Sequence, residues 1–114
     1  MIRVDGVRVH DGTSVALLSG DQVVVRLHDH ETAEEVLNGD GTLARGAVSS
    51  WTLLGGVLTF EYNQRAAETL GFPRVHELSL TLGDDDLGRM RDTLLEILNG
   101  TCCRVETPGG IVTE

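Results

Sequence analysis

Short apolar segments with a period of two residues, separated by glycine-containing turns, constrain the fold of this chain more than any other feature. In one of them, Val23, Val25 and Leu27 would share one side of a strand, and the residues between them would share the other. Residues 78–82 repeat the pattern with leucine at alternate positions. Such alternation is typical of strands with one buried and one solvated face. The turns that separate the segments are Asp11-Gly12, Gly20-Asp21, the loop at 38–41 and Gly55-Gly56.

Two helices are expected in the second half of the chain. Asn63 is positioned to cap a short helix over Gln64–Leu70, which Gly71 would end. A longer helix is expected to begin at the acidic residues 84–86, which suit the positive end of a helix dipole. Its apolar stripe at helical spacing would consist of Leu87, Met90, Leu94, Ile97 and Leu98. The spacing leaves open whether residues 31–37 form a helical turn.

These elements predict a single α+β domain. An antiparallel β-sheet with the connections of a meander would be covered by one long C-terminal helix and one short helix. Residues 43–54 are expected to form one strand of that sheet. The domain would comprise residues 1–100, with residues 101–114 as a C-terminal tail that could contain a short strand. A chain of 114 residues is long enough for one domain with its own core, and no metal or disulfide is needed to complete it.

The charge of the chain excludes some partners. Eighteen acidic residues stand against nine basic ones, all of them arginine, which gives a net charge of −9. Such a surface repels nucleic acids and anionic membranes, and it attracts basic proteins over long range. No apolar run approaches membrane-spanning length, and residues 1–12 lack the apolar centre of a signal peptide. We therefore expect a cytoplasmic protein, and the adjacent Cys102 and Cys103 fit a reducing compartment.

The segment that most resembles a reaction centre contains His28 and His30. Two histidines at i and i+2 on a strand would point to one face, as two ligands of a zinc or copper ion could. The next residue on that face, Arg26, would repel a cation, and no spacing identifies a third ligand. The interpretation that we favour is therefore a solvated end of a strand, with no metal.

Residue types also argue against catalysis. With no lysine in the chain, Schiff-base chemistry and a phosphate-binding P-loop are excluded. Neither a nucleophile elbow nor a glycine-rich nucleotide loop is present. The adjacent cysteines have only Arg104 nearby to lower a thiol pKa, so one of them is expected to pack as a small apolar side chain. The sequence predicts no enzyme and no cofactor.

The order of features between residues 39 and 98 resembles a known family. The segment GDGTLARGAVSSWTLLGGVLTFEYNQRAAETLGFP, followed by VHELSLTLGDDDLGRMRDTLLEIL, is similar to small acidic immunity proteins of bacterial polymorphic-toxin systems, of the immunity protein 10-like kind. The matching parts are a glycine-rich turn, a strand with V-x-S, an alternating strand, an A-A-x-x-L-G helix, a second alternating strand and a closing helix with an acidic start. They correspond to Gly39–Gly46, Val48–Ser50, Leu58–Tyr62, Ala66–Gly71, Leu78–Leu82 and Asp84–Leu98.

The resemblance implies a non-catalytic protein that binds and occludes a cognate toxin. The acidic charge is consistent with a basic toxin as the partner. Clustering, and not the family, suggests the partner-binding residues Asp29, Glu31, Glu34 and Glu35. Trp51 is expected to fill the core, and it would be the strongest anchor for a partner if it were exposed. The alternative function is that of a small-ligand or metal-binding accessory protein, which could be a homodimer.

Overall fold

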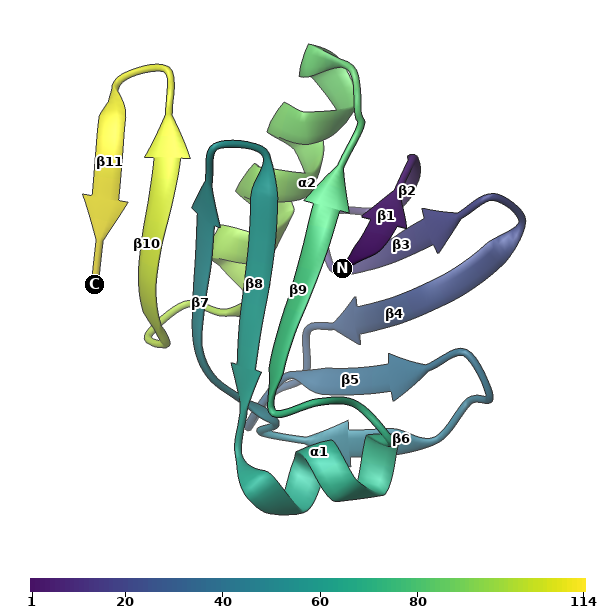
Figure 1. The fold of residues 1–114 in the computed structure, drawn as a ribbon. Helices are drawn as coiled ribbons and strands as arrows, with labels where there is room; N and C mark the ends of the chain where they lie inside the picture. Colours follow the sequence, from purple (N-terminus) through teal and green to yellow (C-terminus); the bar gives the residue numbers. More distant parts are fainter.

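The alternating segments form two β-sheets in the computed structural model, which describes residues 1–114 (Figure 1). The first sheet has five strands that follow one another along the chain, and every neighbouring pair is antiparallel. Glycine-containing turns make three of the four connections, as at Asp11-Gly12, where both residues have positive φ, and the loop 29–34 makes the fourth. The strands are β2 (Gly6–His10), β3 (Ser14–Ser19), β4 (Gln22–His28), β5 (Glu35–Asn38) and β6 (Leu43–Arg45).

The second sheet has six strands in the order β1-β9-β8-β7-β10-β11. It is mixed, because β1 pairs parallel with β9 and β10 pairs parallel with β7, while the other pairs are antiparallel. Figure 1 shows its strands side by side, with the N-terminal strand on one side of β9 and the C-terminal hairpin beside β7. The strands are β1 (Ile2–Val4), β7 (Val48–Leu54), β8 (Val57–Tyr62), β9 (Val75–Leu80), β10 (Cys102–Thr107) and β11 (Gly110–Thr113).

The two helices occupy connections of the six-stranded sheet. Helix α1 (Gln64–Leu70) joins β8 to β9 and lies against β6, and α2 (Asp84–Ile97) joins β9 to β10 and lies against β2 and β3. The Asn63 side chain accepts a hydrogen bond from the Ala66 amide at 2.8 Å, and Gly71 ends α1 with φ 72°, so both predicted caps are confirmed. Neither helix is long and apolar enough to serve as a membrane span.

The structure corrects the single antiparallel sheet expected from the sequence. Residues 43–54 do not form one strand, because the chain leaves the five-stranded sheet after Arg45 and enters the other at Val48. Gly46, with φ 60°, allows the sharp change of direction. The alternation is interrupted at this break, because Arg45 and Gly46 are both exposed and Ala47 and Val48 are both buried.

The structure also decides one question that the sequence left open and corrects one further expectation. Residues 31–37 contain no helical turn, because residues 31–33 form a bend and β5 begins at Glu35. Residues 101–114 are not a tail with one short strand, because β10 and β11 form a hairpin that extends the six-stranded sheet. Cys103 and Val105 are buried there, so this segment belongs to the domain. Helix α2 is consequently followed by two strands and is not the last element of the chain.

One core lies between the two sheets and α2. It gathers inward residues from both sheets and from both helices into a single cluster of 23 buried side chains, so neither sheet has a separate core. The largest members are Trp51, Phe60 and Tyr62, which come from β7 and β8. Met90 and Leu94 supply the apolar stripe of α2, with no exposed surface.

A buried aromatic group within this core contains a histidine. His76 is 2% exposed, its Nδ1 lies 2.9 Å from the Tyr62 hydroxyl, and the ring of Phe72 is 4.4 Å away. Burial lowers the pKa of His76 from its ordinary value of 6.5 and raises the pKa of Tyr62. Both side chains are therefore neutral in the folded protein at neutral pH.

The lowered pKa of His76 predicts a loss of stability in acid. The unfolded chain binds a proton at His76 more readily than the folded chain, so the free energy of unfolding falls as the pH decreases below about 6.5. The contribution is fully present above that value and is lost toward the lower pKa of the folded state. Urea unfolding at about pH 7 and about pH 5 should show a smaller difference in His76→Phe than in the wild type. The exposed-site variant His10→Gln is the control, and an unchanged pH dependence in His76→Phe would contradict the assignment.

Candidate functional site

Carboxylates from two distant segments line one hollow, which we call the acidic hollow. Its volume is about 390 Å³. One wall is the loop between β4 and β5, with Asp29, His30 and Glu31, and the other is the C-terminal end of α2, with Glu96 and Asn99. Four of the ten lining residues are acidic and none is arginine. The other lining residues are Thr32, Ala33, Glu34, Ile97 and Thr101.

Local structure explains why these groups meet. Strand β4 ends at His28, and the Asp29 amide donates a hydrogen bond to the Thr13 carbonyl at 2.8 Å, which fixes the start of the loop. On the other side, α2 ends at Ile97, and the Thr101 amide donates to the Leu98 carbonyl at 2.9 Å as the chain turns toward β10. The loop is thus bonded to the turn between β2 and β3, and the segment after α2 is closed by its own turn.

The electrostatics of the acidic hollow favour a cation. None of Asp29, Glu31 and Glu96 forms a salt bridge. The last turn of α2 contains no basic residue, so Glu96 adds a negative charge where the helix dipole is already negative. Cations, and not carboxylates, are the stabilising groups at this end of a helix. The arrangement therefore costs stability, and a positively charged group placed in the hollow would relieve it.

Glu34, which the sequence suggests as a partner-binding acid, has a structural role. Its side chain is 9% exposed, and Oε1 accepts a hydrogen bond from the Val48 amide at 2.9 Å. Its carbonyl accepts from the Gly46 amide at 2.9 Å. Both bonds hold the segment that crosses from one sheet to the other. One oxygen of the carboxylate is consequently occupied within the domain, which is a structural role that the sequence did not predict.

Glu35 and Trp51, unlike Glu34, do not line the acidic hollow. Glu35 points to the opposite face of β5 from Val36, where its Oε2 accepts from Arg45 Nε at 2.9 Å, so its charge is neutralised. Trp51 is 1% exposed and belongs to the core. It cannot serve as the exposed anchor that the sequence allowed. Its Nε1 atom is buried without a hydrogen-bond partner.

His28 and His30 do not share a face, because β4 ends at the first of them. His28 lies over the outer side of the five-stranded sheet, and His30 lines the acidic hollow. No three His, Cys, Asp or Glu side chains come together in a geometry that could hold a metal ion. The cysteines also point apart, with Cys102 exposed and Cys103 buried, and burial raises the pKa of the Cys103 thiol.

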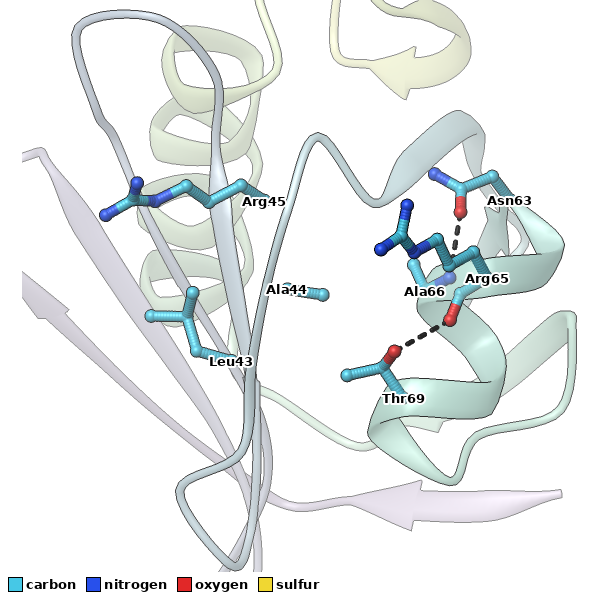
Figure 2. Close-up of a pocket in the computed structure, with 7 residues that line it drawn as sticks. All are labelled: Leu43, Ala44, Arg45, Asn63, Arg65, Ala66 and Thr69. Carbon is cyan, nitrogen blue, oxygen red and sulfur yellow. Dashed lines mark hydrogen bonds between the residues drawn. The ribbon is translucent and has the colours of Figure 1, made fainter.

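A second hollow, between β6 and α1, offers little chemistry (Figure 2). Its polar groups are already used: Asn63 caps α1, and the Thr69 hydroxyl donates to the Arg65 carbonyl at 2.9 Å. Figure 2 shows Arg45 directed away from α1, and its Nε donates a hydrogen bond to Glu35. Only the guanidinium of Arg65 remains for a ligand, so we assign no function to this hollow.

No family model, curated protein or solved structure matches this chain. The site therefore has to be judged from its own geometry.

Reasoning from the sequence missed Glu96, Asn99 and Thr101 as members of the acidic hollow. These residues are far from Asp29 along the chain, so the sequence does not show that they line the same hollow. One local signal was available: Glu96 stands in the last turn of a predicted helix, where a basic residue is the favourable choice. A local rule that is broken without compensation often marks a functional position.

Proposed function

We propose that this protein is a non-catalytic, cytoplasmic binding protein that occludes a basic partner protein, as the resemblance to polymorphic-toxin immunity proteins suggests. The observation that supports the proposal best is the acidic hollow, which Asp29, Glu31 and Glu96 line without forming a salt bridge. An arginine or lysine of the partner would neutralise these groups and the C-terminal end of α2 together.

The overall charge acts with the hollow. A net charge of −9 steers a basic protein toward the surface and raises the association rate, and the hollow then fixes the position of one cationic side chain. A partner protein whose basic cleft is covered in this way cannot bind its substrate. Inhibition by occlusion needs no chemistry from the inhibitor.

The test is co-expression with the product of a toxin gene encoded beside the gene for this protein. We expect the two proteins to purify together and the complex to weaken as salt is added, because screening acts on exposed charges. The single variants Glu31→Gln and Glu96→Gln should each weaken binding about tenfold. Glu77→Gln, at an exposed position on β9, is the matched control. A complex that is indifferent both to salt and to the hollow variants would refute the role of the hollow.

Glu96→Gln is also expected to raise stability while it lowers affinity. Removal of a negative charge from the last turn of α2 should increase the free energy of unfolding by about 0.5 kcal/mol. Thermal unfolding of the free protein at low ionic strength would measure the change against Glu77→Gln. A loss of stability in Glu96→Gln would mean that the Glu96 carboxylate makes a favourable contact. Repulsion between this carboxylate and the C-terminal end of α2 would then not be the dominant effect.

A further inference from the structure

The outer face of the five-stranded sheet carries a group of cationic side chains in this otherwise acidic protein. Strand register places Arg8, Ala16 and Arg26 in one row across β2, β3 and β4. The adjacent row on the same face is His10, Ser14 and His28. The two rows line one open trough of about 490 Å³, which we call the cationic trough.

The cationic trough is deepest along its central strand, β3. Ala16 and Ser14 on the central strand have short side chains, whereas long or ring side chains stand on the strands at either side. Ala16 points outward and is only 6% exposed. Two strand spacings separate Arg8 from Arg26, about 10 Å between their backbones. Both guanidinium groups can therefore reach one ligand held above Ala16.

The charges of the trough are largely unpaired. Neither Arg8 nor Arg26 forms a salt bridge. Two carboxylates are close by: Asp11, 3.4 Å from His10, and Glu35, which Arg45 already binds. A chain with twice as many acidic as basic residues could neutralise these arginines easily. Instead, two of its nine arginines and two of its four histidines stand together, and neither arginine has a salt-bridge partner.

We propose that the cationic trough binds the phosphate group of a small phosphorylated ligand. The planar guanidinium group of an arginine can donate two parallel hydrogen bonds to the oxygens of a phosphate. The Ser14 hydroxyl and the imidazole N–H groups of His10 and His28 add further donors. The trough is larger than one phosphate, so the remainder of the ligand would lie along the strands. Nucleic acid is a poorer match, because the net charge of −9 repels a long polyanion. The site shares no residue with the acidic hollow and is independent of the proposed function.

Titration calorimetry with inorganic phosphate, and then with phenyl phosphate, tests the proposal. We expect saturable binding of one phosphate per chain, tighter for the ester, and a loss of about tenfold or more in Arg8→Gln and in Arg26→Gln. Arg8→Lys should retain part of the affinity, because it keeps the charge and loses the fork. Arg74→Gln and Arg104→Gln, at exposed positions outside the trough, are the matched controls.

Three results would overturn the proposal. The first is the absence of saturable phosphate binding at millimolar concentrations, in protein whose circular dichroism shows that it is folded. The second is equal loss of affinity in the trough variants and in the control variants, which would indicate general attraction of anions. The third is tighter binding of a single-stranded oligonucleotide than of phenyl phosphate, which would make the face a nucleic-acid surface. Because Arg8 is exposed and its side chain makes no salt bridge, a folding defect should not obscure the outcome.

Discussion

Trp51→Ala is expected to lower the free energy of unfolding by about 3–5 kcal/mol, a large share of the stability of a domain of this size. The indole is 1% exposed and lies opposite Phe60 on β8 and Cys103 on β10, so its removal leaves a cavity where three strands meet. Strands β8 and β10 flank Trp51 on β7, and paired strands cannot move easily to fill the cavity. Urea unfolding followed by circular dichroism measures the change, because the variant has no tryptophan to report by fluorescence.

Trp51→Phe is the informative companion. The Nε1 atom is buried without a hydrogen-bond partner, which costs the wild type about 1–3 kcal/mol. Phenylalanine removes this unpaired donor and keeps much of the apolar contact. We therefore expect Trp51→Phe to cost less than about 1.5 kcal/mol. A cost as large as that of Trp51→Ala would show that the indole N–H contributes a favourable interaction.

Glu34→Ala is expected to lower the free energy of unfolding by about 2–3 kcal/mol. The substitution leaves the Val48 amide, a buried donor at the start of β7, without its acceptor at 2.9 Å. Glu34→Gln is the matched control, because the amide oxygen can accept the same hydrogen bond, and it should cost less than half as much. Urea unfolding gives the stability of both variants. Hydrogen exchange at the Val48 amide should accelerate in Glu34→Ala and remain slow in Glu34→Gln.

Equal costs for Glu34→Ala and Glu34→Gln would contradict this account. The cost would then come from charge or from packing, and not from the hydrogen bond to the crossing segment. Asn63 also holds the crossing segment. Its side-chain Nδ2 donates to the Gly46 carbonyl at 3.0 Å, and its backbone N–H donates to the Ala47 carbonyl at 2.9 Å.

The parts of the fold that depend on neighbouring residues could be predicted from the sequence. Gly55 and Gly56 have φ 58° and 76°, as the tight turn between β7 and β8 requires, and this pair was a turn signal in the sequence. Asn63 and Gly71 bound α1 as expected. In each case a local backbone requirement selects the residue type.

The division into two sheets could not be predicted, because an alternating pattern shows which side of a strand is buried and not which sheet the strand joins. The parallel pairing of Ile2 with Leu78, and of Cys102 with Ser50, links segments far apart in the sequence. The candidate site shows the same limit. An acid such as Glu34 is expected at the surface, and only the fold brings a backbone amide against it.

The arrangement of the two sheets has a consequence for how the chain acquires its structure. Residues 6–45 complete the five-stranded sheet through hairpins alone, so these contacts have low contact order and can form early, even while the ribosome is still extending the chain. The six-stranded sheet must wait, because its neighbouring strands span residues 2–113. During that delay the inward face of the early sheet, with Val15, Leu17 and Leu27, remains uncovered. Nascent chains of this topology would depend on chaperones, or on rapid synthesis, to avoid aggregation.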